Sequence, residues 1–159
     1  MTFFVDADSC PVRVREIICT TAARLHIQAV FVANRPIPIP KNPYCRSEIT
    51  DAGDQAADLY ILAHAARGDM VITRDIPLAK RLVDAHIRVI NDRGAVYTAG
   101  NIKERLSLRN FMYELAANGL SPERTKTFGR KEIMKFAQTL DCESLRLMKS
   151  ASELPEYEV

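Results

Sequence analysis

The stretch Met-Val-Ile-Thr-Arg-Asp over residues 70–75 decides the fold that this chain can adopt. Its first three residues form an apolar run short enough for a buried strand. Ile76-Pro77 then opens a helix, because proline is tolerated in the first helical turn. Asp75 is therefore predicted at the carboxyl end of a strand and just before a helix. In open α/β sheets, this edge is where ligands bind.

A second stretch near the N-terminus has the same form. Phe3-Phe4-Val5 is a short apolar run, Asp6-Ala7-Asp8 follows it, and Ser9-Cys10-Pro11 leads into a helix. The carboxyl ends of the strands in a parallel sheet lie at one edge, so the two stretches place three carboxylates there. Asp6, Asp8 and Asp75 are thus predicted to share one rim of the sheet.

Strands and helices alternate along the chain, which predicts an α/β fold of three layers, α/β/α, with a mostly parallel central sheet. Strands are expected over 2–5, 29–32, 70–73 and 88–90, and helices over 12–25, 54–67, 76–85, 102–118 and 131–140. Turns are expected over 49–53, 91–94 and 98–101. Four prolines over 34–43 favour an extended surface loop. One domain over 1–141 is expected, followed by a partly ordered acidic tail over 142–159.

The composition is that of a soluble globular protein. Of 159 residues, 47% are hydrophobic and 26% are charged, and no apolar run is long enough to span a membrane. The N-terminus has no signal-peptide pattern, and the four cysteines have no zinc-site spacing, so a reducing cytoplasm with free thiols is expected. The net charge of +2 is too small to indicate a nucleic-acid partner. A basic excess over 101–149 could attract phosphate, or it could be a solvated helix face.

A further pair of acids lies on the predicted helix over 54–67. Asp54 and Asp58 are four residues apart and therefore share one face, where a bound cation would offset their repulsion. Asp54 could instead cap the helix, and Asp8 or Ser9 could cap the helix that begins near residue 12. Carboxylates from separate elements that meet at a strand edge suit Mg²⁺ or Mn²⁺. Such ions activate water and stabilise an in-line phosphoryl displacement.

Several motifs together resemble one bacterial family. They are Val-Asp-Ala-Asp-Ser-Cys-Pro-Val (5–12), Gly-Asp-Gln-Ala-Ala-Asp (53–58), Gly-Asp-Met-Val-Ile-Thr-Arg-Asp-Ile-Pro-Leu-Ala (68–79), Asp-Arg-Gly (92–94) and Asn-Ile (101–102). In these motifs the chain resembles the YaiI/YqxD family, which is grouped with PIN-like nucleases. The resemblance covers roughly residues 2–141. It implies a PIN-like α/β/α fold with an acidic, divalent-metal site of the nuclease type.

The resemblance also implies individual roles. Asp6 matches the first-strand acid, with Asp8 beside it, and Asp58 or Asp54 matches the helix acid. Thr73 and Asp75 match the Thr-x-Asp of the later strand. PIN nucleases usually carry a further acid shortly after that aspartate, but residues 76–80 supply none. The fourth ligand would then be Asp8, Asp54 or Asp92.

These observations lead to one functional hypothesis and two alternatives. The hypothesis is a phosphodiesterase that uses Mg²⁺ or Mn²⁺ and acts on RNA. The expected metal ligands are Asp6, Asp54, Asp58 and Asp75, the expected catalytic residues are Asp6, Asp8, Asp58 and Asp75, and the expected substrate-binding residues are Thr73, Asn34, Arg35, Arg74 and Arg93. For each arginine, a surface salt bridge is the other interpretation.

The first alternative is a PIN-like module that binds RNA or a protein without cleavage. The second is a phosphatase with Asp6 as nucleophile, because Asp6-x-Asp8 after a strand resembles haloacid-dehalogenase-like enzymes. That pattern normally has Thr or Val where this chain has Cys10. A membrane partner is not expected, and a homodimer is left open.

Overall fold

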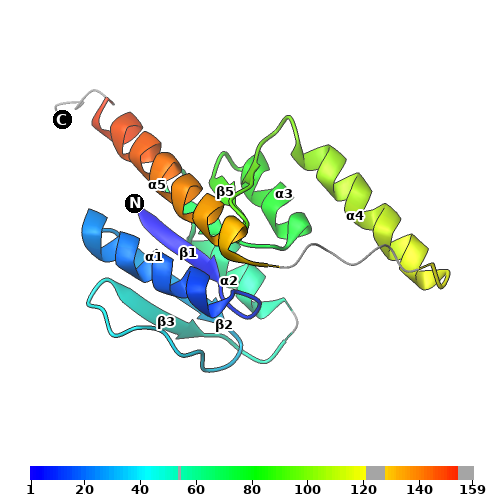
Figure 1. The fold of residues 1–159 in the computed structure, drawn as a ribbon, viewed down its shortest axis with the longest axis horizontal. Coiled ribbons are helices and arrows are strands. Elements are labelled where there is room, and N and C mark those ends of the chain that lie inside the picture. The colour runs from blue at the N-terminus through cyan, green and yellow to red at the C-terminus, as the bar shows by residue number, and fades with distance from the viewer. Residues whose placement is uncertain (54, 121–127, 154–159) are drawn as a thin grey trace.

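The structure is a computed structural model, and it describes residues 1–53, 55–120 and 128–153. Figure 1 shows one central sheet covered by helices on both faces. The strands are β1 (Thr2–Asp6), β2 (Gln28–Ala33), β3 (Cys45–Ile49), β4 (Met70–Ile72), β5 (Arg88–Ile90) and β6 (Val96–Tyr97). The helices are α1 (Val12–Leu25), α2 (Ala56–His64), α3 (Ile76–Asp84), α4 (Ile102–Ala117) and α5 (Arg130–Ser152).

The sheet has the strand order β3-β2-β1-β4-β5-β6. The first five strands in this order are parallel, and β6 alone pairs antiparallel with β5. The chain leaves β1 towards β2 on one side and later returns to β4 on the other side. The crevice between β1 and β4 is therefore a topological switch point, the place in such sheets where ligands bind. The predicted α/β class with a mostly parallel sheet is confirmed.

Two hydrophobic clusters define the outer layers. In β1, Phe3 and Val5 point to the cluster that includes Phe136 of α5, whereas Phe4 points to the cluster that includes Ile61 of α2 and Leu82 of α3. This alternation follows from the two-residue repeat of a strand. Both faces of β1 are buried, so its continuous apolar run is typical of a central parallel strand. The predicted three-layer arrangement is confirmed.

Two strands were not predicted from the sequence. β3 lies at the sheet edge, and its residues are only intermediate or exposed, so Cys-Arg-Ser-Glu-Ile lacks the apolar run that marks a buried strand. β6 has two residues, which is too short for periodicity to detect. α2 spans Ala56–His64 and so ends before the predicted residue 67, while the predicted start at residue 54 lies outside the described residues.

The last helix is longer than predicted. Instead of ending at residue 140, α5 continues to Ser152, so most of the segment expected to be a tail is helical. Leu140 and Ser144 are buried, and Leu147 packs against the core, which extends the buried stripe at helical spacing. Glu143 is also buried, and its carboxylate lies 2.7 Å from a guanidinium nitrogen of Arg88. The remainder of the expected tail, residues 154–159, lies outside the described residues.

α4 differs from the other helices because most of it extends away from the sheet (Figure 1). Ile102, at its start, is buried, whereas Leu108, Phe111 and Tyr113 are exposed. The start of α4 packs beside α3. Over the part of the chain that the structure describes, every helix is too short or too polar to cross a membrane.

Candidate functional site

The candidate site lies at the carboxyl ends of β1 and β4. Asp6 is the last residue of β1, and Thr73 follows β4 directly beside it. The hydroxyl Oγ1 of Thr73 donates to Oδ2 of Asp6 at 2.9 Å and accepts from the backbone N–H of Asp75 at 3.0 Å. Asp75 is the N-cap of α3, and its Oδ1 accepts from the backbone N–H of Leu78 at 2.9 Å. The buried Thr73 thus connects Asp6 and Asp75 through hydrogen bonds at the strand edge.

Asp58 joins these acids from the first turn of α2. Burial, the negative charges of Asp75 and Asp6, and a hydrogen bond to Asp75 raise the pKa of Asp58 to about 7, while the charge of Arg81 opposes this shift. Burial also raises the pKa of Asp6, the hydrogen bond from Thr73 opposes that shift, and the charges of Asp75 and Asp8 add to it. Three of the predicted site residues, Asp6, Asp58 and Asp75, therefore lie close enough to repel one another.

The burial of Asp58 and its repulsion by Asp75 and Asp6 together predict a pH-dependent loss of stability. The pKa of Asp58 is about 7 in the folded chain, against an ordinary value of 3.8. Between these values the folded chain holds a proton that the unfolded chain has released, so the free energy of unfolding falls from about pH 4 to about pH 7 and is level above. Because water partly screens Asp58, we expect this loss to be about 1 kcal/mol.

Asp58→Asn should remove this loss. The variant should match the wild type at pH 4 and exceed its free energy of unfolding by about 1 kcal/mol at pH 8, as measured by urea unfolding. Asp84→Asn is the control, since Asp84 is exposed and lies at the far end of α3, where it pairs with Lys80. Equal pH dependence in the two variants would contradict the repulsion at the site.

Asp8 is paired with the loop that follows β2. Its Oδ2 accepts from the backbone N–H of Asn34 at 3.3 Å, and its Oδ1 lies 3.6 Å from Nε of Arg35. Asn34 and Arg35, predicted to bind substrate, therefore hold the proline-rich loop against Asp8. α1 begins after Pro11 with no side-chain cap, so Asp8 and Ser9 do not cap it. The acid/base role that a phosphatase would need from Asp8 gains no support from these contacts.

Arg74, Asp92 and Arg93 lie on the other side of Asp6. Asp92 is buried, and its Oδ2 lies 3.6 Å from Nε of Arg74. Burial raises the pKa of Asp92, although the charges of Arg74 and Arg93 oppose the shift. The guanidinium of Arg93 also lies over the ring of Phe128, at 5.5 Å from its centroid. Arg74 thus forms the salt bridge that was the alternative to phosphate binding.

A thiol lies beside the same crevice. Cys10 lines a narrow pocket together with Asp6, Thr73 and Asp92. Burial raises the pKa of Cys10 to about 12, so its thiol stays protonated at neutral pH. It is therefore a packing residue rather than a nucleophile.

A groove of about 320 Å³ begins at the acids and runs between α2, α3 and α4. Asp58 and Asp75 line it together with Arg81 of α3 and Arg109 of α4. Sequence reasoning did not select these two arginines. The basic excess over 101–149 was a weak signal for Arg109, but only the packing of α4 beside α3 brings it to the acids.

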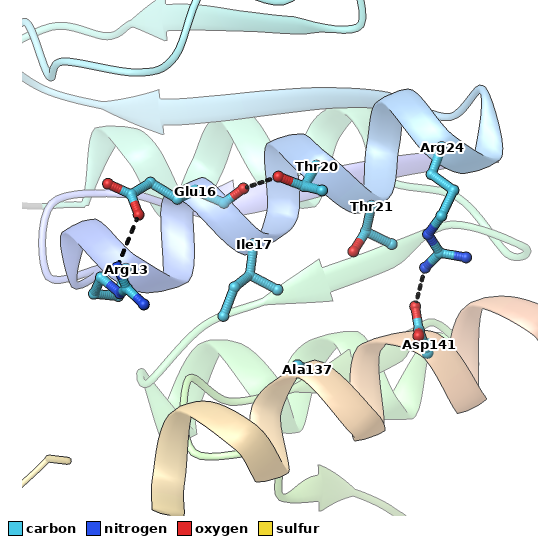
Figure 2. Close-up of a pocket in the computed structure, with 8 residues that line it drawn as sticks. All are labelled: Arg13, Glu16, Ile17, Thr20, Thr21, Arg24, Ala137 and Asp141. Carbon is cyan, nitrogen blue, oxygen red and sulfur yellow. Dashed lines mark hydrogen bonds and ion pairs between the residues drawn. The ribbon is translucent and has the colours of Figure 1, made fainter. Parts of the chain in front are cut away.

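A second hollow, of about 330 Å³, lies between α1 and α5 (Figure 2). Its charged groups pair with each other: Arg13 lies 3.8 Å from Glu16, and Arg24 pairs with Asp141. None of the acids of the candidate site lines this hollow. It is an ordinary groove between two packed helices.

The carboxylate oxygens of the candidate acids are suitable ligands for a hard divalent cation, but the acids are not arranged as a complete ligand set. Over residues 1–53, 55–120 and 128–153, no three Asp, Glu, His or Cys side chains form a ligand set for a metal. Asp54, a predicted ligand, lies outside these residues. Mg²⁺ is commonly held by one or two carboxylates, with water and substrate phosphates completing its shell. The adjacent carboxylates of Asp58 and Asp75 suit that mode of binding.

Comparison with known proteins identifies the family. The model of the uncharacterised YaiI/YqxD family matches residues 4–145. The chain is 57% identical over 151 residues to a UPF0178 protein of Treponema pallidum, covering 95% of this chain and 85% of that protein. It is 47% identical over 150 residues to a UPF0178 protein of Syntrophobacter fumaroxidans, covering 94% and 97%. No solved structure matches the chain significantly. The family match spans most of the chain, and the chain therefore belongs to the YaiI/YqxD family.

Proposed function

We propose that this protein is a PIN-like phosphodiesterase that uses Mg²⁺ or Mn²⁺ to cleave RNA in the cytoplasm. The observation that carries this proposal is the meeting of Asp6, Asp58 and Asp75 at the switch point of the sheet, where burial and the charges of Asp75 and Asp6 raise the pKa of Asp58 to about 7. Folded proteins keep such unfavourable charge clusters mainly at functional sites. A divalent cation would offset the repulsion.

In this proposal, the three acids have different roles. Asp58 and Asp75 would hold the metal, which supplies Lewis-acid activation of water and charge stabilisation at phosphorus. Asp6 Oδ2 is held by Thr73, which leaves Oδ1 to accept a proton from the attacking water. Thr73 sets the relative position of Asp6 and Asp75, because its hydroxyl bonds to both residues.

One observation favours a non-catalytic binding module instead. Residues 76–80 contain no acid, and no three-residue ligand set is found among the described residues. A module of this kind would bind RNA but would not respond to divalent metals. The two functions are therefore separated by metal binding.

A calorimetric titration with Mn²⁺ tests the proposal. The wild type should bind Mn²⁺ at millimolar concentration or below, and Asp6→Asn/Asp75→Asn should bind at least roughly tenfold more weakly. Asp84→Asn is the matched control for loss of an acid, and it should bind as the wild type does. No binding by the wild type, or equal binding by the double variant, would overturn the metal site and favour the binding module.

A further inference from the structure

We infer that Arg81 and Arg109 form a subsite for a backbone phosphate of a single-stranded RNA, next to the phosphate that reacts at the acids. This inference rests on the proposed function and adds the residues that would hold the substrate strand. Both arginines line the same groove as Asp58 and Asp75. A strand with one phosphate at the acids would therefore extend along this groove towards the two guanidinium groups.

The groove holds two acids, Asp58 and Asp75, as well as the two arginines, and it is the arginine guanidinium groups that support a phosphate as the occupant. Arg35 and Arg74, which also lie near the acids, are paired with Asp8 and Asp92. By contrast, no carboxylate among the described residues lies within 4.0 Å of the guanidinium groups of Arg81 or Arg109. Guanidinium groups bind phosphate with paired hydrogen bonds, and two of them provide a site that a single surface cation does not.

Arg109 is also held in place from α4. Its Cζ lies 4.4 Å from the centroid of the Tyr113 ring, and its Nη1 donates to Oδ1 of Asn110 at 3.1 Å. These interactions limit the freedom of a long side chain and lower the entropy cost of binding. Tyr113 is 61% exposed, so its ring remains accessible to an unstacked base. Tyr113 thus acts as a positioning residue for Arg109.

The subsite also explains the position of α4. Only the start of this helix is buried, yet Arg109 farther along it lines the groove, and the ring of the exposed Tyr113 lies against the Arg109 guanidinium. A duplex would present no unstacked base to Tyr113, whereas a single strand would. The groove therefore fits a single strand.

Fluorescence anisotropy with a labelled single-stranded oligouridylate tests the subsite. The measurement is made in EDTA and again with Ca²⁺, so that binding is separated from cleavage. Arg81→Gln/Arg109→Gln should bind roughly tenfold more weakly than the wild type. The slope of log K against log salt concentration should become shallower by about 0.7 for each phosphate that is no longer neutralised. Arg67→Gln/Lys103→Gln is the control, because it removes the same charge from exposed positions outside the groove.

Two further variants address the role of Tyr113. Tyr113→Leu removes the ring and should weaken binding roughly threefold, whereas Tyr113→Phe keeps the ring and should restore it. Equal loss in both variants would mean that Tyr113 does not act through its ring.

The outcomes separate this inference from the proposed function. Equal affinity and salt slope in the arginine variant and its control, or no binding by the wild type in either condition, would overturn the subsite whatever the Mn²⁺ titration shows. Arginine-dependent binding without Mn²⁺ binding or cleavage would support the subsite and overturn the phosphodiesterase.

Discussion

In the proposed phosphodiesterase, Asp6→Asn should lower the rate of Mn²⁺-dependent RNA cleavage by a factor of about 10³, within the range expected for the loss of a general base. The asparagine side chain still has an oxygen that can accept the hydrogen bond from Thr73, so the connection to Asp75 is retained. What the variant loses is the negative charge and the ability to accept a proton from water. The expected defect is therefore in kcat rather than in the affinity for RNA.

The experiment compares single-turnover cleavage of a labelled oligoribonucleotide by the wild type, Asp6→Asn and Asp84→Asn. Asp84→Asn also removes one acid, but from an exposed site that pairs with Lys80, and it should retain the wild-type rate. Thermal unfolding of all three proteins checks the fold. Asp6→Asn should be at least as stable as the wild type, because burial and neighbouring acids raise the pKa of Asp6. A folded Asp6→Asn that cleaves at a rate within about threefold of the wild type would exclude Asp6 from catalysis.

The acids of this site could be found from sequence because local rules place them. A short apolar run followed by an aspartate and a helix start predicts a carboxylate at a strand edge, and both Asp6 and Asp75 lie there. The same rules could not predict the partners of Asp8, because Asn34 and Arg35 come from the loop after β2. Contacts between distant segments do not follow from periodicity. For the same reason, the sequence did not predict that Arg81 and Arg109 share a groove with the acids.

Helix ends and edge strands were harder to predict from the sequence than the central strands. β3 is exposed at the edge of the sheet, so its residues show no apolar run. The sequence did not predict that α5 continues beyond residue 140, because its core-facing stripe there includes the polar residues Glu143 and Ser144. Glu143 is tolerated there because Arg88 and Arg146 both pair with its carboxylate. A buried, paired acid cannot be distinguished in sequence from one that marks a solvated tail.

Gly94→Ala should lower the free energy of unfolding by about 3 kcal/mol, the sum of a backbone term and a packing term. Gly94 has φ +81°, a conformation that residues with a side chain rarely adopt. A Cβ atom at this position would lie 2.7 Å from the backbone oxygen of Lys135 and 2.9 Å from the backbone N of Phe136. Both atoms belong to α5, so the helix itself would have to move.

Gly68→Ala separates the two terms. Gly68 has φ +99°, but among the described residues, apart from its two chain neighbours, no heavy atom lies within 4 Å of the position of its Cβ. It should therefore lose only the backbone term, about 1 kcal/mol. Urea unfolding followed by circular dichroism measures both variants under the same conditions. Equal losses would mean that the close approach of α5 to Gly94 contributes nothing to stability.

A larger loss in Gly94→Ala would have a consequence for the site as well. The backbone oxygen of Gly94 accepts from Oγ1 of Thr139 in α5 at 2.8 Å, so the turn and the helix are joined at this point. Asp92 lies in the same turn, and its carboxylate pairs with Arg74 beside the acids. Displacing α5 would therefore disturb one wall of the crevice next to Asp6. The packing of α5, whose Phe136 and Leu140 are buried in the core, is therefore connected to the crevice through the turn at Gly94.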